Sequence, residues 1–399
     1  MKRILAMVLL ISSIFAVAQG QTLVPGAGLS PSGKQIPEAR KAGNGKPAQY
    51  GDYNRLATAL VERARETGDF GDYLQAGEAL HRSFELAPNN FETEKIRISI
   101  LLGEFEFPAA LDAAQALQKR VPDDVMVYGL LTDANIELGN YRDAENSAQW
   151  MLNLRPGNLP ALTHAARLRE LFGDVEGSYE LLELALQSVS STGGKESAGI
   201  LAAMGHLRLV AGNPGAAEAL LQQALAAFPD YRGALGDLAQ VRIAQKRYED
   251  AVVLLRQRHQ AVPRIEYLYD LAEGLQLAGH TEEAEKIFQE FETKALPLSE
   301  KRANANRELV FYYADHARQP AKALAIAQKE FAWRQDVYTL DAYAWALRAN
   351  GQLADARKQI EAALAVGIQD AKLFRHAEEI VLRSGDRAAA ENYRRQSAE

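Results

Sequence analysis

Apolar residues in the stretch Val125–Asn158 recur at helical spacing in two short runs. In the first run, Tyr128 and Leu131 lie three residues apart, so their side chains share one face of a helix. Gly139 then stands where a left-handed residue ends a helix at little cost, and Pro156 cannot continue a second helix. The stretch therefore predicts two amphipathic helices joined by a turn.

The second helix repeats the spacing with small and apolar residues, at Ala144, Ala148 and Met151. Ala144 is expected to be small because the two helices cross there, and a larger side chain would force their axes apart. A single hairpin leaves its apolar face uncovered. Each large apolar side chain that a neighbouring hairpin covers contributes roughly 1.5–3 kcal/mol, so repetition is a physical requirement.

The same pattern recurs from Tyr50 onward at a period of about 34 residues. Prolines close several of the units, at Pro122, Pro229 and Pro263. We count about ten units, of which the first and the eighth are irregular. The predicted fold class is therefore all-α, a right-handed solenoid of about ten helical hairpins over residues 50–399, in which each hairpin contacts its neighbours.

This unit resembles the tetratricopeptide repeat, whose preferred positions are filled by Tyr128, Leu131, Gly139, Tyr141, Ala144, Ala148 and Pro156. The departure is Thr132, where the family favours Gly or Ala. Two stretches, LNLRPGNLPALTHAARLRELFGD and RQDVYTLDAYAWALRANGQLADARKQIEAAL, are similar to bacterial exported members of the family. The resemblance implies that the first helix of each unit lines a concave surface and that the protein belongs to the cell envelope or is secreted.

Two places depart from the regular repeat. The segment Ser188–Ser197 is the widest gap between units, so it is the expected joint in the stack. The unit Asn304–Asp336 carries Phe311 where a small residue is usual, and Pro320 lies in its turn. Because the stability of a solenoid is a sum of repeat and neighbour contributions, these two places are expected to open first.

The N-terminal residues Met1–Ala18 have the order of a secretory signal: two basic residues, an apolar run, and a small-x-small cleavage site. We expect the mature chain to start at Gln19; an uncleaved anchor is the alternative. Residues Gln19–Gln49 are rich in Gly, Pro, Ser and Lys and predict a flexible leader. The expected location is periplasmic or secreted, without a membrane span once the signal is removed.

The amino-acid composition limits both the chemistry of the protein and the classes of partner that it can bind. The 399 residues include no cysteine, which excludes disulfides, thiolate catalysis and cysteine-bound zinc. The formal net charge is −7 and the isoelectric point is about 5.7. An acidic chain of this kind argues against a nucleic acid or an anionic membrane as the partner.

The sequence offers little support for an enzyme. Its seven histidines are scattered, with no HExxH pair, and neither a GxSxG elbow nor a phosphate-binding loop is present. Paired carboxylates such as Glu282-Glu283 are typical of solvated helix faces. We therefore predict no catalytic residue, no metal site and no cofactor.

Binding on the concave face is the favoured hypothesis. The face opposite the packing stripe of the first helices carries aromatic and charged residues, densest between Tyr269 and Arg375. The predicted peptide-binding residues are Tyr269, Glu273, Tyr312, Asp341, Trp345, Arg348 and Arg375. Aromatic anchors ringed by charges are typical of interface hot spots. The alternative for each residue is packing between repeats.

Some family members grip a partner's C-terminal carboxylate with Lys and Asn residues on three consecutive first helices. Lys95 fits one such position, but Ser99, Leu130, Pro160 and His164 occupy others, so this clamp is not expected in residues 91–192. The favoured function is an exported, non-catalytic scaffold that binds a protein or peptide. The alternative is a structural subunit of an envelope assembly or polysaccharide-export machine acting through its convex faces; an enzyme is third.

Overall fold

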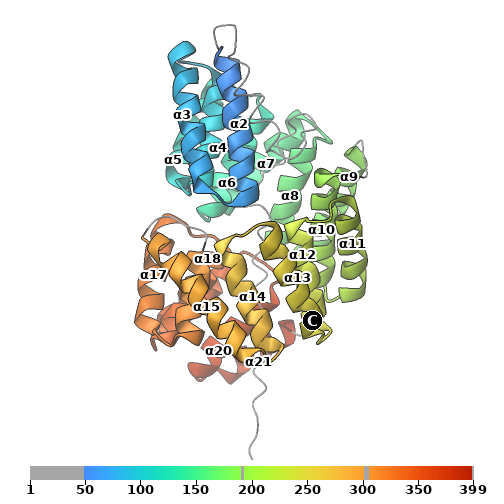
Figure 1. Cartoon of the computed structure of the whole chain (residues 1–399), viewed down its shortest axis with the longest axis vertical. Helices are drawn as coiled ribbons and strands as arrows, with labels where there is room; N and C mark the ends of the chain where they lie inside the picture. Colours follow the sequence, from blue (N-terminus) through green and yellow to red (C-terminus); the bar gives the residue numbers. More distant parts are fainter. Residues whose placement is uncertain (1–48, 190–192, 301–304, 398–399) are drawn as a thin grey trace, which may run out of the picture.

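The computed structural model describes residues 49–189, 193–300 and 305–397, and every regular element among them is helical. The helices form ten consecutive pairs within these residues. Figure 1 shows their course from the blue N-terminal end to the red C-terminal end. The first helices of the pairs are α2 (Tyr50–Thr67), α4 (Phe91–Gly103), α6 (Val125–Glu137), α8 (Leu159–Leu171), α10 (Lys195–Val210), α12 (Arg232–Ala244), α14 (Ile265–Leu277), α16 (Asn306–Phe311), α18 (Val337–Ala349) and α20 (Ala371–Arg383). The second helices are α3 (Phe70–Leu86), α5 (Phe107–Arg120), α7 (Tyr141–Leu154), α9 (Val175–Ser188), α11 (Pro214–Ala227), α13 (Tyr248–Ala261), α15 (Thr281–Ala295), α17 (Pro320–Trp333), α19 (Leu353–Leu364) and α21 (Arg387–Gln396). The prediction of an all-α solenoid of helical hairpins is confirmed.

The hairpin of α6 and α7 forms for the reasons that its sequence predicts. The Asp124 side chain caps α6 by accepting hydrogen bonds from the backbone N–H groups of Met126 and Val127. Gly139 ends the first helix with a φ of 75°, the left-handed conformation that glycine adopts without strain. Ala144 is fully buried at the helix crossing. Local turn chemistry and crossing geometry thus produce one unit.

The superhelix turns far enough for its later helices to reach its earlier ones. The Val337 N–H donates to the Tyr141 hydroxyl at 2.9 Å, although the two residues are 196 positions apart in the sequence. The Arg264 guanidinium donates to the Arg65 carbonyl, 199 positions away. In Figure 1 the helices α2–α7 accordingly form a lobe that lies against the lobe of α14–α18. Repeats about six units apart are therefore neighbours in space.

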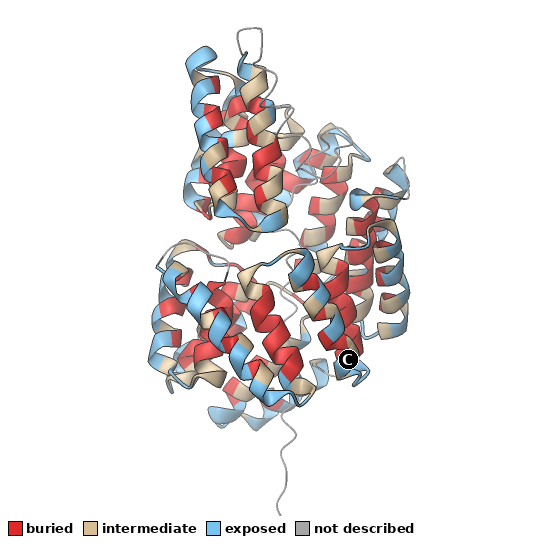
Figure 2. Cartoon of the chain, viewed as in Figure 1, coloured by how far each residue is buried: buried red, intermediate tan, exposed pale blue. Residues whose placement is uncertain are grey.

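Burial differs between the two helices of each pair. The first helices α6, α12 and α14 are buried along most of their length, whereas second helices such as α7 and α13 are buried only on the face toward their partner. Figure 2 shows this contrast as red first helices and partly blue second helices such as α3 and α11. The core therefore consists of apolar clusters between neighbouring pairs, enclosed by the outer helices.

The two irregular places predicted from the sequence have different structures. Six residues separate the end of α9 at Ser188 from the start of α10 at Lys195, and of these, residues 190–192 lie outside the described part of the chain. In the Asn304–Asp336 unit, α16 has only six residues and runs into a π-helix, η3 (Tyr312–His316). A π turn accommodates an extra residue within a helix, so the first helix of this unit is interrupted.

The N-terminal segments predicted as signal and leader, up to residue 48, lie outside the described residues. Among the helices that the structure describes, none combines the length and the hydropathy needed to cross a membrane. A short 3-10 helix, η2 (Leu296–Leu298), follows α15.

Candidate functional site

The inner wall of the superhelix is formed by the first helices, and it is rich in buried ionisable side chains. Within the described residues these are Lys95, Asp133, Glu137, His164, His206, Asp237, Arg242, Asp270, Glu273, Arg307, Glu308, Asp341 and His376. The second helices contribute Asp72, Arg258 and Glu330. Burying a charge is costly unless it is paired, and apolar replacements of buried ion pairs are often at least as stable. Fold stability alone therefore does not account for this concentration, which marks the inner wall as the candidate site.

The seven residues predicted to bind a peptide all lie on this wall, on α14, η3, α18 and α20. The structure encloses most of them: Tyr269 is 4% exposed, Asp341 2% and Trp345 7%. Arg375 is half-buried and remains accessible. The seven residues lie close together, but most of the contacts between them run through other side chains. These are Asp315, His316, His376 and Glu379, which the sequence did not single out as binding residues.

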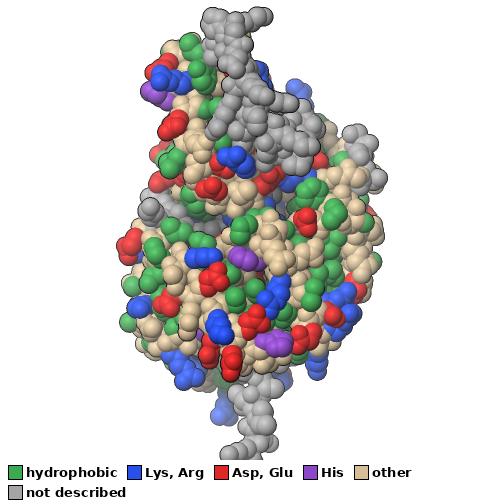
Figure 3. Space-filling model, viewed as in Figure 1, with side chains coloured by type: hydrophobic (Ala, Val, Ile, Leu, Met, Phe, Trp, Pro, Cys, Tyr) green, Lys and Arg blue, Asp and Glu red, His purple; other side chains and the backbone are tan. Residues whose placement is uncertain are grey.

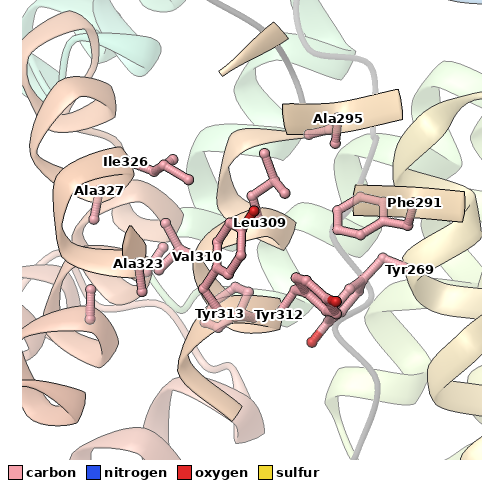
Figure 4. Close-up of a cluster of buried hydrophobic side chains, with 14 of the residues drawn as sticks. Tyr269, Phe291, Ala295, Leu309, Val310, Tyr312, Tyr313, Ala323, Ile326 and Ala327 are labelled. Atoms are coloured by element: carbon pink, nitrogen blue, oxygen red, sulfur yellow. The ribbon is translucent and has the colours of Figure 1, made fainter. Parts of the chain in front are cut away.

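Tyr269 and Tyr312 lie side by side in the largest apolar cluster, against Phe288 and Phe291, as Figure 4 shows for the labelled rings. The Tyr312 hydroxyl donates to Glu292 at 3.0 Å. Burial, together with this bond to Glu292, raises the pKa of Tyr312 to about 12. In this state the two rings act as packing between repeats, the alternative role considered for them.

Trp345 is held by polar contacts at its edge and by ring contacts on its faces. Its indole N–H donates to Asp315 at 2.8 Å, and its ring stacks on the imidazole of His376 with 3.9 Å between centroids. The guanidinium of Arg348 lies 3.6 Å from the indole centroid. Arg348 also pairs with Asp315 at 3.1 Å and with Glu379 at 2.6 Å. Trp345 therefore lies in a network that joins η3, α18 and α20.

Four histidines connect successive first helices through carboxylates. His164 on α8 lies 3.2 Å from Asp133 on α6, and His376 on α20 lies 2.6 Å from Asp341 on α18. His206 on α10 approaches Glu170 and Asp237, on the helices to either side, at 3.3 and 3.4 Å. His316 on η3 pairs with Glu273 on α14 at 2.5 Å. The sequence carries a faint signal of this arrangement, since its histidines recur about once per repeat.

Burial and neighbouring charges change the pKa values of several side chains on the inner wall. Burial lowers the pKa of His206, but Asp237 and Glu170 outweigh it and raise that pKa to about 10. Burial raises the pKa of Asp270 to about 6, even though Arg258 lies 2.6 Å away. Burial and then the nearby Glu266 raise the pKa of Glu308 to about 8. The Oε2 atom of Glu308 has no hydrogen-bond partner in the described part of the chain.

Two cations on α20 remain at the accessible edge of the wall. Arg375 has no hydrogen bond or ion pair with any residue that the structure describes, and burial lowers the pKa of its guanidinium. Three residues earlier on the same face, the ammonium of Lys372 lies 3.5 Å from the centroid of the Phe311 ring. Burial also lowers the pKa of Lys372. These groups can accept a carboxylate or a carbonyl oxygen from outside.

A polar hollow lies where α6 and α8 meet α16 and α18. It has a cavity volume of about 30 Å³ and is lined by Ile136, Glu137, Tyr141, Arg167, Glu170, Leu171, Arg307, Asp336, Val337 and Tyr338. A water needs roughly 10–15 Å³ of such volume, so the hollow has room for water. No group of three or more metal-binding side chains occurs within the described ranges. The visible surface in Figure 3 intersperses acidic and basic groups.

Comparison with known proteins supports the fold. Residues 209–268 match a family model described as a tetratricopeptide repeat. The structure resembles that of the human IFIT1 dimer with PPP-AAAA, with a TM-score of 0.51 and 13% identity over 93% of this chain and 95% of that one. The human IFIT1 dimer with m7Gppp-AAAA gives a TM-score of 0.50 and 13% identity over 93% and 96%.

A looser match is the crystal structure of PilW, a widely conserved type IV pilus biogenesis factor. Its TM-score is 0.44 and its identity 16%, over 51% of this chain and 92% of that one. No curated protein matches the chain in sequence. At 13% identity, the likeness to the IFIT1 structures shows the fold alone.

Proposed function

We propose that this tetratricopeptide-repeat solenoid is an exported, non-catalytic scaffold that binds a segment of another protein on the inner wall of its first helices. The observation that carries the proposal is the concentration of ionisable side chains on that wall, where an apolar surface would serve stability equally well. The accessible edge of the wall, at Lys372 and Arg375, is the proposed point of first contact.

A protein segment fits the wall better than a nucleic acid does. The wall presents both signs of charge in alternation, with Asp315, Arg348 and Glu379 in one network. A polyanion requires a surface that is predominantly basic, because phosphate neutralisation dominates its affinity. The human IFIT1 structures hold PPP-AAAA or m7Gppp-AAAA, but the net charge of −7 in the present chain favours a polypeptide of mixed charge.

The predicted binding residues divide into two groups under this proposal. Arg375, and Arg348 beside the half-exposed Glu379, would contact the partner directly. Tyr269, Glu273, Tyr312, Asp341 and Trp345 would form the enclosed part of the wall, reached only if the superhelix loosens. The carboxylate-paired histidines would hold the first helices in register, which is a structural role and not a catalytic one.

The outer surface is the competing site, because it carries large apolar side chains. Val253 on α13 is 63% exposed and Trp150 on α7 is 52% exposed. Trp150 stacks on Tyr128 of the first helix of its own pair, with 6.1 Å between centroids. These side chains belong to separate second helices, and exposed apolar residues that occur singly are usual on soluble proteins. A structural subunit of an envelope assembly would use such a surface.

Photo-crosslinking distinguishes the two surfaces. A photoreactive residue placed at Arg375 should capture a partner from the native envelope, whereas one at Trp150 should not. The substitution Arg375→Ala should weaken capture by about 2 kcal/mol, the scale of an interface hot spot, and leave the melting transition in place because the side chain has no described partner to lose.

The matched control is Arg394→Ala, an arginine on the exposed face of α21 whose ion pair is with its own helix, to Glu391. It should leave capture unchanged. Capture from Trp150 but not from Arg375, or equal capture by Arg375→Ala and the parent protein, would assign binding to the outer surface.

A further inference from the structure

The contact between successive turns of the superhelix is a defined structure, for which we use the name seam. It joins segments 137–141 and 172–173 of the first turn to segments 334–337 and 367–369 of the second. The Gln335 N–H donates to the Glu137 carbonyl at 3.0 Å. A nearest-neighbour stack has no such contact, because each unit touches only the units beside it.

Two glycines make this close approach feasible. A Cβ atom at Gly173 would lie 2.4 Å from the carbonyl oxygen of Gly367, and one at Gly139 would lie 2.8 Å from that of Gln335. Both glycines end first helices with a positive φ, of 80° and 75°. Gly279 ends α14 in the same way with a φ of 86°, but a Cβ there would meet nothing within 4 Å. The crowding is therefore a property of the seam and not of the turn.

Apolar and charged groups act in opposite directions at the seam. Ile136 and Leu171 of the first turn share an apolar cluster with Val337 and Leu347 of the second, which holds the turns together. Beside it, Arg334 is 1% exposed and faces three carboxylates, of Glu330, Glu137 and Asp336, at 2.5, 3.5 and 3.8 Å.

The charged group is incompletely satisfied. The short contact of Arg334 is with Glu330 on its own turn; across the seam its guanidinium lies 3.5 Å from the Oε2 atom of Glu137, which has no hydrogen-bond partner among the described residues. A half-satisfied polar network inside a protein contributes less than an apolar contact of the same size. Hydration of these groups on opening would offset part of the apolar area lost, so closure is favoured only modestly.

We propose that the seam is a latch: closed, it encloses the inner wall of the first helices, and open, it admits a partner to that wall. The inference extends the proposed function, since the wall that the latch covers is the proposed binding surface. It explains how ionisable residues of the inner wall that lie between the two turns, such as Glu137 at 4% and Arg307 at 5% exposure, can be almost fully buried and yet belong to a binding surface.

The latch can be tested without a partner, using the glycines as a matched pair. Gly173→Ala and Gly279→Ala impose the same left-handed strain on a turn, but only the first introduces a clash with the second turn. Because the chain contains no cysteine, a single Gln240→Cys on the inner wall of α12, where Gln240 is 6% exposed, reports access to the wall through its rate of reaction with a thiol reagent.

We expect Gly173→Ala to raise that rate by about tenfold or more, since overpacking a tight contact shifts an equilibrium by at least this order. Gly279→Ala should leave the rate near that of the parent. Spin labels on exposed Gln149 of α7 and Gln328 of α17, on either side of the seam, should move apart only in Gly173→Ala. A second pair, Gly139→Ala with Gly351→Ala as its control, guards against a variant that fails to fold.

Equal thiol rates in Gly173→Ala and Gly279→Ala would overturn the latch, as would separation of the spin labels without faster reaction of the inner-wall cysteine. If the thiol rates and label distances follow the expectation but no partner is captured from Arg375, the latch stands and the proposed function fails. The two conclusions are therefore tested separately.

Discussion

Glu308 shows, at the scale of one residue, how burial on the inner wall changes the acidity of a side chain. It lies on α16, 1% exposed, in a region shared with the carboxyl groups of Glu266 and Asp270. Burial and these neighbours raise the pKa of Glu308 from 4.5 to about 8. The carboxyl group is therefore mostly protonated at neutral pH, and its ionisation opposes folding.

Replacing Glu308 should change how stability depends on pH. The folded protein holds a proton on Glu308 up to about pH 8, whereas the unfolded chain releases it above about pH 4.5. Between these values the free energy of unfolding of the parent should fall by up to about 1.4 kcal/mol per pH unit from this group, and then level off. Glu308→Gln should remove this slope and be the more stable protein at pH 8.

Denaturant titrations at pH 5 and pH 8 measure the effect, with Glu285→Gln on the exposed face of α15 as the control. If Glu308→Gln and the parent lose the same stability between the two pH values, the carboxyl group is not held protonated in the folded state.

At the scale of elements, the histidine–carboxylate pairs join first helices that belong to different repeats. Packing within a pair, by contrast, rests on small residues such as Gly205 of α10, where a Cβ would lie 2.8 Å from Leu221 of α11. His206 pairs with acidic groups on both neighbouring helices. Each such pair adds a directional contact to an interface that is otherwise determined by shape.

Removing His206 should therefore have a pH-dependent cost. The pKa of His206 is about 10 in the folded protein, against 6.5 for the free side chain, so its contribution is complete below pH 6.5 and lost as pH rises to 10. His206→Gln should be less stable than the parent at pH 6, by up to several kcal/mol at about 1.4 kcal/mol per unit of pKa shift, and the difference should vanish near pH 10.

The free energy of unfolding at pH 6, 8 and 10 is the measurement. His81→Gln, an exposed histidine on α3 paired only with Glu85 of its own helix, is the control and should show little difference at any of the three values. A stability difference between His206→Gln and the parent that does not change with pH would mean that the ring acts only by its shape.

At the scale of the whole molecule, contact between turns changes how the solenoid is expected to open. In an open stack, the joint at Ser188–Ser197 would let the two ends separate independently. Here the seam ties α6–α8, before the joint, to α16–α20, after it. The segment expected to be the weakest joint is therefore spanned by contacts between helices that precede it and helices that follow it.

Hydrogen exchange should reveal this bridging. Residues 188–197 should exchange early, while the segments on the two sides of the seam should be protected together and lose protection together in Gly173→Ala. The irregular unit at Asn304–Asp336 should be well protected in spite of its π turn, because Phe311, Tyr312 and Tyr313 lie inside the largest apolar cluster. Exchange in η3 as early as in residues 188–197 would contradict this expectation.

The hairpins and their number follow from the sequence because their determinants are local. Gly139 at the turn, Ala144 at the crossing and Pro156 after the second helix each act within a few residues, and the pattern recurs at a fixed period. The inner face of the first helices was predicted from two sources: the helical period separates it from the packing face, and the resemblance to the tetratricopeptide repeat implies that first helices line the concave surface.

Only the tertiary structure decided which inner residues are accessible. The curvature of a solenoid is the sum of small rotations between repeats, and no single repeat encodes that sum. The rotation present here brings Ile136 of α6 and Val337 of α18 into one apolar cluster and buries Glu137 and Arg307 between the turns. Tyr269 and Trp345 are instead covered by neighbouring repeats. Arg375 lies at the edge of the same wall and remains accessible. The periodic pattern therefore determines what the wall is made of, and the accumulated twist determines how much of it a partner can reach.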